Sequence, residues 1–335
     1  MSTNPEPVVP QAVHIAVVIP CFKVRDLVLS VIERVPPMVT SIHVVDDCCP
    51  QHTGLHVQSH CKDPRVRLVF HQENKGVGGA TVSGYRDALS VGARVIVKID
   101  GDGQMDPTDL DRFVRPILIS RADYTKGNRF FDIELLRAMP RARLFGNSVL
   151  SLVNKLCSGY WNINDPTNGY TAIHADVLRL LPIEKLDERF FFESDLLFRL
   201  NVIRAVVTDV PIESRYGDEV SNLSVARVSV EFPGKYLARF IKRIFYSYFL
   251  RDFTPGTVAL VTGSSLVVAG GTFGAWRWYL SGQSGRPATS GEVMFSALPV
   301  LVGCQLLISA VNFDIANVPT DPLHPALESK HGSGI

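Results

Sequence analysis

The sequence predicts an α/β domain with a mostly parallel sheet, followed by an amphipathic helix and two transmembrane helices. Three observations support this architecture. Short β-branched runs alternate with helical patterns through the first half of the chain. The last third is the richest in apolar residues. A segment that mixes basic and aromatic residues separates these two parts.

The elements of the α/β part follow one another in order. Short apolar runs predict buried strands at 14–22, 41–48, 66–72, 94–100 and 122–128. Helices are expected at 26–35, before two prolines, at 73–93 after a glycine-rich turn, at 106–118, from 143 onward, and after 187–195. In such a sheet the ligand crevice lies beyond the carboxyl ends of the strands.

Bulk properties exclude some classes of function. The chain has 335 residues and a net charge of +1, so its charge does not indicate a nucleic-acid partner. Its six cysteines form no CxxC pair and no zinc-ribbon spacing, which predicts reduced thiols in a cytosolic compartment. Residues 1–13 lack the pattern of a signal peptide and are expected to be a disordered lead.

The turn DGDGQ, 100–104, is the strongest chemical signal. It places Asp100 and Asp102 directly after a buried strand, where both carboxylates can face one hard cation. The glycines of this turn let the backbone approach a ligand closely. Aspartate and glycine are also common in ordinary solvated turns. Its place beside Asp47, at the end of another strand, favours a binding site.

The rest of the chain predicts a membrane anchor. Residues 231–254 mix Lys235, Arg239, Lys242 and Arg243 with aromatic residues, as expected for a helix on an anionic membrane surface. The uncharged segments Thr257–Trp276 and Val293–Phe313 are each long enough to cross the bilayer. A surface helix packed on the domain and a buried helical hairpin are the alternatives.

These segments define the predicted organisation. It comprises a lead at 1–13, a catalytic domain at 14–230, an interface helix at 231–254, two transmembrane helices within 255–314 and a tail at 315–335. The basic flank before the first span places the large domain in the cytoplasm by the positive-inside rule. Two spans return the tail to the same side of the inner membrane.

Six motifs, read in order, carry a resemblance: VVIPCF, VVDD, NKGVGGATVSGYRDAL, VKIDGDGQMDP, GNR and DPTNGY. Together they resemble family 2 glycosyltransferases of the GT-A fold, the nucleotide-diphospho-sugar transferase fold. By architecture the chain is most similar to polyprenyl-phosphate glycosyltransferases with C-terminal transmembrane helices. The resemblance covers roughly residues 14–225. It implies a nucleotide-sugar donor, a polyprenyl-phosphate acceptor, a membrane location and Mg²⁺ or Mn²⁺ as cofactor.

The resemblance also implies site residues. The donor would be bound by Pro20, Phe22, Asp47, Asp100, Gln104 and Arg215, and the metal by Asp100 and Asp102. The catalytic acidic positions would be Asp102, Asp165 and Glu193, and the acceptor phosphate would be held by Arg129, joined by Arg143 from the following helix. The structural alternatives are surface charges for the two acceptor arginines, a turn cap for Asp165 and an arginine partner for Glu193.

Two departures from the family pattern affect donor binding. Lys23 and Val24 stand where many relatives have Asn-Glu, and Ser221-Asn222 stands where a Ser-Lys pair is common. Lys75 could serve the diphosphate in place of the missing lysine.

The expected reaction is inverting transfer of a sugar to a polyprenyl phosphate, in glycan biosynthesis for the cell envelope. Transfer to a polysaccharide or protein, a nucleotidyltransferase and a catalytically inactive membrane scaffold are the alternatives. A processive synthase would add a QxxRW motif, which the sequence lacks. The sugar, the base, the polyprenol and the oligomeric state stay open, a homo-oligomer included.

Overall fold

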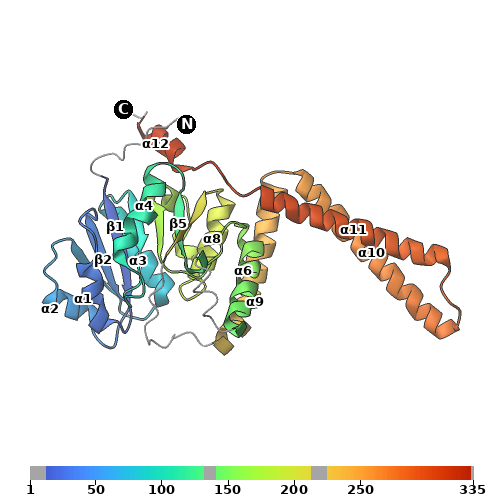
Figure 1. Ribbon diagram of the computed structural model, residues 1–335, viewed down its shortest axis with the longest axis horizontal. Coiled ribbons are helices and arrows are strands. Elements are labelled where there is room, and N and C mark those ends of the chain that lie inside the picture. Colours follow the sequence, from blue (N-terminus) through green and yellow to red (C-terminus); the bar gives the residue numbers. More distant parts are fainter. Residues whose placement is uncertain (1–12, 132–140, 213–224, 333–335) are drawn as a thin grey trace. The chain divides into compact units, whose positions relative to one another are not determined.

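The computed structural model describes residues 13–131, 141–212 and 225–332 (Figure 1). The chain forms two compact units. The first joins Met1–Phe240 to Pro319–Ile335, and the second is Ile241–Val318. The second unit is therefore inserted, in sequence, between the body of the first unit and its last segment.

The first unit is built on a seven-stranded sheet within the described residues, in the order β3-β2-β1-β4-β6-β5-β7. Only β6 is antiparallel to its neighbours, so the mostly parallel sheet is confirmed. The strands are β1 (Ile15–Cys21), β2 (Ser41–Asp46), β3 (Val66–Phe70), β4 (Val95–Lys98), β5 (Tyr124–Asn128), β6 (Thr171–His174) and β7 (Val207–Pro211). Strands β6 and β7 were not predicted.

Helices connect and cover these strands (Figure 1). They are α1 (Arg25–Glu33), α2 (Thr53–His60), α3 (Gly76–Ser90), α4 (Leu110–Leu118), α6 (Arg141–Ser158), α7 (Ala175–Arg179), α8 (Phe192–Val202), α9 (Val225–Phe245) and α12 (His324–Gly332). Short 3-10 turns, Pro107–Asp109, Arg129–Phe131 and Ile183–Lys185, link some of them. The sequence did not predict α2, α7 or α12.

Every residue of β1 is buried, because helices cover both faces of the sheet. Val17 and Ile19 pack in one cluster with residues of α1 and α4. On the other face, α3 comes so close to β1 that a Cβ on Gly84 would lie 2.2 Å from a methyl carbon of Val18. The apolar strand runs therefore form the core and fix the crevice at their carboxyl ends.

The C-terminal tail packs on the rest of the first unit through one buried carboxylate. Asp123, just before β5, is fully buried and accepts the backbone N–H groups of Val206, Leu323 and His324 at 2.9–3.0 Å. The ring Nδ1 of His324 lies 2.8 Å from an oxygen of the same carboxylate. Burial raises the pKa of Asp123, but these hydrogen bonds outweigh it, so the pKa lies below its usual value.

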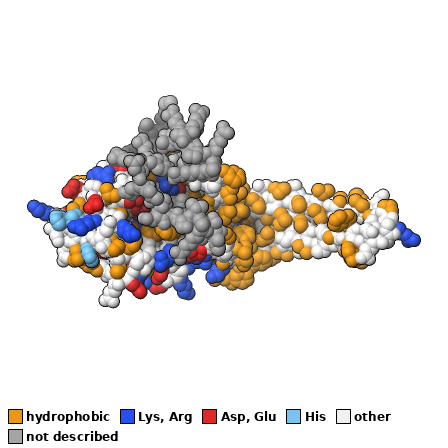
Figure 2. Space-filling model, turned by 90° about the horizontal axis from the view of Figure 1, so that it is seen from below, with side chains coloured by type: hydrophobic (Ala, Val, Ile, Leu, Met, Phe, Trp, Pro, Cys, Tyr) orange, Lys and Arg blue, Asp and Glu red, His pale blue; other side chains and the backbone are white. Residues whose placement is uncertain are grey.

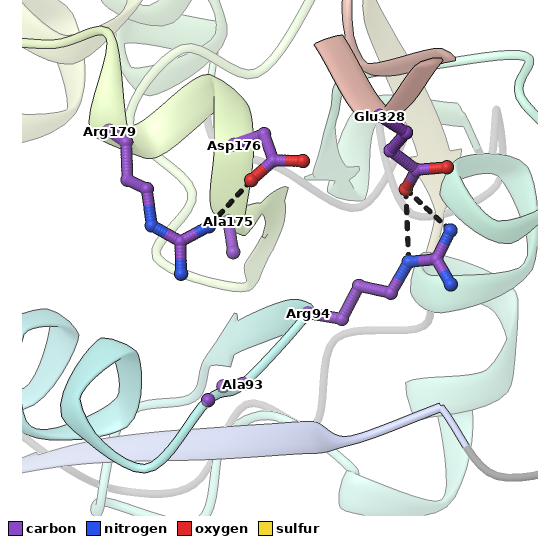
Figure 3. Close-up of a pocket in the computed structure, with 7 residues that line it drawn as sticks. Ala93, Arg94, Ala175, Asp176, Arg179 and Glu328 are labelled. Carbon is purple, nitrogen blue, oxygen red and sulfur yellow. Dashed lines mark hydrogen bonds and ion pairs between the residues drawn. The ribbon is translucent and has the colours of Figure 1, made fainter. Parts of the chain in front are cut away.

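A second contact of the tail lines the pocket drawn in Figure 3. Arg94 donates to Glu328 of α12 at 2.9 Å through Nε, while Arg179 pairs with Asp176 on α7. Arg94 immediately precedes β4, whereas the DGDGQ turn follows it. This pocket therefore lies at the opposite end of the sheet from the predicted site.

Two basic residues of helix α9 form ion pairs within the first unit, which the predicted interface helix did not include. Lys235 Nζ lies 2.6 Å from an oxygen of Asp187, and Arg239 Nε lies 2.8 Å from the fully buried Asp195. Tyr236 between them is also buried. These two cations therefore hold α9 on the first unit, as the packed-helix alternative expects for them, while the interface helix at 231–254 stays a prediction.

The second unit contains an antiparallel pair of long helices, α10 (Pro255–Ser284) and α11 (Ser290–Ala316). Gly263 and Gly303 meet where they cross: a Cβ on either would lie 2.8–2.9 Å from the carbonyl oxygen of the other. Small residues here allow the close contact seen between transmembrane helices. At the base of the pair, Arg243 donates to both oxygens of Asp314, and Tyr248 donates to one of them.

Both helices are long and apolar enough to cross a membrane, and both extend beyond the predicted spans. Only 17% and 11% of their most apolar windows are buried, so large hydrophobic side chains face outward (Figure 2). A buried hairpin in a soluble core would hide these side chains, so the exposure favours the membrane-spanning prediction over that alternative.

The docked tail makes His324 a test of the fold. We expect His324→Ala to lower the free energy of unfolding by about 1–3 kcal/mol, because the buried Asp123 carboxylate loses one of its donors. Thermal unfolding of the full chain in detergent measures the effect, with His60→Ala on the exposed end of α2 as control. Equal losses of stability in the two variants would contradict the docking.

Candidate active site

The DGDGQ turn lies where the sequence places it, directly after β4 and beside the end of β1. The Ile99 N–H donates to the Val18 carbonyl, which carries the pairing of β1 and β4 up to the turn. The Asp100 side chain is 29% exposed, Asp102 is half-buried and Gln104 is exposed. The backbone N–H of Gln104 donates to Asp102 at 3.1 Å. The two carboxylates are thus held at the crevice and remain reachable from it.

A buried lysine lies under this turn, which the sequence analysis did not select. Lys98, the last residue of β4, is fully buried. Its Nζ lies 2.9 Å from Asp100 Oδ1 and 3.2 Å from Glu193 Oε1 on α8. Burial alone would lower the pKa of Lys98, but the two carboxylates outweigh it and hold the pKa above its usual value. Glu193 therefore pairs with a lysine, and not with an arginine as the alternative proposed.

The DPTNG turn, 165–169, lies against the same ion pairs. A Cβ on Gly169 would be 2.3 Å from Asp100 Oδ2 and 2.7 Å from Lys98 Nζ, so only glycine fits there without displacement. The buried Nζ of Lys126, on β5, donates to the Asn168 carbonyl at 2.5 Å. Burial lowers the pKa of Lys126 to about 8, although Glu193 and Asp165 oppose this.

Arg129 and Asp165 form the second ion pair of the site. Arg129 follows β5, and its Nε and Nη2 donate to the two oxygens of Asp165 at 2.7 and 3.0 Å. Asp165 is fully buried and also accepts the backbone N–H of Arg129. Burial raises the pKa of Asp165, but Arg129 outweighs it and keeps the pKa below its usual value. Asp165 thus orients Arg129, whose side chain is 28% exposed.

Asp47 lies at the end of β2 but is almost fully buried. Its two oxygens accept the backbone N–H groups of Lys75 and Gly76 at 2.9 and 2.8 Å, and His71 Nδ1 lies 2.7 Å away. The carboxylate therefore holds the glycine-rich start of α3 in place. Gly76 has a φ of +83°, which a residue with a side chain would adopt only under strain.

Of the remaining predicted residues, some are described by the structure and others are not. Pro20 is buried within β1, and Phe22, just after it, is 40% exposed at the crevice. Arg143 belongs to the first turn of α6, but its side chain lies outside the described residues. Arg215 lies outside them altogether. The structure thus brings together Asp100, Asp102, Glu193 and Gly169, with Arg129 and Asp165 at the other end of the DPTNG turn.

The carboxylate oxygens of the DGDGQ turn are ligands that suit a divalent cation. Asp100 and Asp102 offer hard oxygen ligands two positions apart, and Gly101 adds no side chain between them. Lys98 engages Oδ1 of Asp100, while Oδ2 lies beside Gly169 of the DPTNG turn. Such a site fits a hard cation that keeps waters or takes phosphate oxygens as further ligands.

Comparison with known proteins gives one family. The model of Glycosyl transferase family 2 matches residues 16–181. The chain is 31% identical over 152 residues to the UDP-N-acetylglucosamine–dolichyl-phosphate N-acetylglucosaminyltransferase of Methanococcus voltae, covering 45% of this chain and 60% of that relative. It is 30% identical over 175 residues to the undecaprenyl-phosphate mannosyltransferase of Micrococcus luteus, covering 52% of this chain and 71% of that relative.

The fold is shared with a solved glycosyltransferase structure. The glucosyl-3-phosphoglycerate synthase of Mycobacterium tuberculosis, in complex with Mn²⁺, UDP and phosphoglyceric acid, superposes with a TM-score of 0.52 and 17% identity. The match covers 69% of this chain and 78% of that one. The sheet and its crevice are therefore of the GT-A type, as the sequence predicted.

Gly169 tests how closely the two turns approach. We expect Gly169→Ala to lower the midpoint of thermal unfolding by several degrees, because its Cβ would displace Asp100 or Lys98 from a buried ion pair. Gly146→Ala on α6 is the matched control, since nothing lies within 4 Å of the added Cβ there. A Gly169→Ala chain as stable as the control would show that the turns are not in contact.

Proposed function

Because this chain belongs to glycosyl transferase family 2, we propose that it transfers a sugar from a nucleoside-diphosphate sugar to a polyprenyl phosphate. That it is a glycosyltransferase follows from the family. Relatives named for dolichyl- and undecaprenyl-phosphate transfer support the acceptor. The observation that carries the proposal is the pair of Asp100 and Asp102 at the strand end, combined with two exposed apolar helices.

On the donor side, the two aspartates would hold Mg²⁺ or Mn²⁺, and with it the diphosphate of the nucleotide sugar. The role of a cation there is to stabilise the negative charge that develops on the leaving diphosphate. Phe22 would flank the base or ribose from the end of β1, with Pro20 and Asp47 shaping the backbone around it. Lys75, Gln104 and Arg215 complete the proposed donor contacts.

On the acceptor side, the nucleophile is a phosphate oxygen, and phosphate monoesters have a second pKa near 6. Much of the acceptor is therefore dianionic at neutral pH, and orientation matters more than a strong base. Arg129 would bind this phosphate, and its two hydrogen bonds to Asp165, which fix its orientation, support that role. Arg143 would join it from the start of α6. Transfer with inversion would give a β-linked lipid sugar from an α-linked donor.

A membrane surface would bring the lipid to this crevice. On α6, Phe145, Val149 and Leu152 recur at helical spacing and are 73%, 45% and 52% exposed. The opposite side of the same helix packs in a core cluster with Phe191 and Tyr236. An outward apolar stripe on a packed helix suits partial insertion into a lipid surface. We place the catalytic unit on the cytoplasmic face of the inner membrane.

The transfer assay tests the proposal. Wild-type membranes with undecaprenyl phosphate and labelled UDP- and GDP-sugars should give label in the lipid extract. Asp102→Asn should abolish it in a folded chain, because one carboxylate ligand is lost. EDTA should do the same to the wild type, with recovery on Mg²⁺ or Mn²⁺. Label found only in polysaccharide or protein would assign the acceptor to those classes, and full turnover in EDTA would exclude the metal.

The apolar stripe of α6 gives a separate prediction. Changing Phe145, Val149 and Leu152 together to serine should raise the apparent KM for a long-chain polyprenyl phosphate on the order of 10-fold, because apolar burial at the lipid surface is lost. The KM for a short, water-soluble isoprenyl phosphate should not change. Leu55→Ser on α2, also half-exposed, is the control. Equal changes for both acceptors would contradict a role at the lipid surface.

A further inference from the structure

Two fully buried lysines lie next to each other in the sheet. Lys98 of β4 and Lys126 of β5 are both register partners of Thr171 on β6, which runs between them. Residues in register across neighbouring strands share one face of the sheet, so both side chains extend to the same side. Lysine is almost never fully buried unless it is paired. The partners of each lysine therefore reveal what the charge is for.

The partners of Lys98 come from two different segments that converge on the site. Asp100 belongs to the DGDGQ turn, and Glu193 to the first turn of α8. Gly169 of the DPTNG turn closes the remaining side, since a Cβ there would touch the ammonium. Lys126 instead donates to the Asn168 carbonyl and so holds the backbone of the DPTNG turn. Only Lys98 contacts an aspartate of the proposed donor motif.

We infer that Lys98 is a positioning residue of the transfer reaction: it binds Oδ1 of Asp100 and, with Gly169 lying against Oδ2, fixes the orientation of this carboxylate at the end of β4. The inference rests on the proposed function and assigns this lysine a role in it. Glu193 takes part as the second partner that keeps the ammonium in place. An apolar residue at position 98 would leave two carboxylates facing each other without a cation between them.

One double variant separates the positioning role of Lys98 from its contribution to the buried charge. Lys98, Asp100 and Glu193 together carry a net charge of −1. Lys98→Met combined with Glu193→Gln keeps that charge, because one positive and one negative group are removed together. The double variant therefore leaves no extra buried charge, while Asp100 loses the group that orients it. Lys185→Met, an exposed lysine in a 3-10 turn, is the control.

The measurement is calorimetric titration of the full-length chain in detergent with UDP and with GDP, each in the presence of Mn²⁺. We expect the double variant to keep its unfolding temperature within a few degrees and to bind the nucleotide about 10- to 150-fold more weakly, as the loss of a hydrogen bond to a charged group predicts. In an Asp100→Asn background the same pair of changes should have little further effect, because Lys98 acts through Asp100.

A second variant covers the case in which the double variant does not fold. Lys98→Arg keeps the buried charge, but the larger guanidinium has a fixed planar geometry, so it would hold the Asp100 carboxylate in a different orientation than the compact ammonium does. It should weaken Mn²⁺-dependent binding at least 3-fold. Wild-type binding in either folded variant, or equal losses with and without Asp100, would overturn the inference.

These titrations use no acceptor, so the inference and the proposed function can fail separately. A wild-type chain that binds nucleotide with Mn²⁺ but transfers no sugar to polyprenyl phosphate would refute the proposed acceptor and leave the role of Lys98 in place. A wild-type chain that binds neither nucleotide would refute both.

Discussion

A buried positive charge needs an anionic partner, and this constraint organises the centre of the first unit. Lys98 ends β4 inside the protein, so the chain must supply carboxylates at that depth. It does so from the DGDGQ turn and from α8, which brings two distant segments to one strand end. The DPTNG turn can approach only because Gly169 has no side chain. The shape of the crevice thus follows from the pairing of one ammonium group.

A second buried charge, the carboxylate of Asp123, organises the opposite end of the sheet. Asp123 accepts donors from Val206, just before β7, and from the C-terminal tail, so two segments far apart in the sequence share one carboxylate. The two ends of the sheet thus differ: the carboxyl ends of the central strands carry the candidate site, and the opposite end holds the tail. The pocket in Figure 3 belongs to the tail contact, where both carboxylates are already paired with arginines.

The parallel strands and the acidic turn could be predicted because apolar runs and turn residues signal them locally. The same is true of the two long apolar helices. Strand β6 could not, because four residues flanked by a turn and a short helix carry too little pattern. Lys98 did leave a signal: a lysine inside an apolar run that must be buried needs a partner. The partner itself depends on tertiary structure, as does the pairing of Lys235 and Arg239, which the basic pattern of α9 attributed to a membrane.

The order of the units along the chain has a consequence for biosynthesis. The hydrogen bonds to Asp123 stay incomplete until Leu323 and His324 have been synthesised. These two residues follow the entire second unit in the chain. During translation the ribosome completes both long apolar helices before the first unit can receive its last segment. The contacts of the first unit with its last segment therefore form only on a chain whose two long apolar helices have already been synthesised. The last step in forming the first unit is in this way timed after the synthesis of the second.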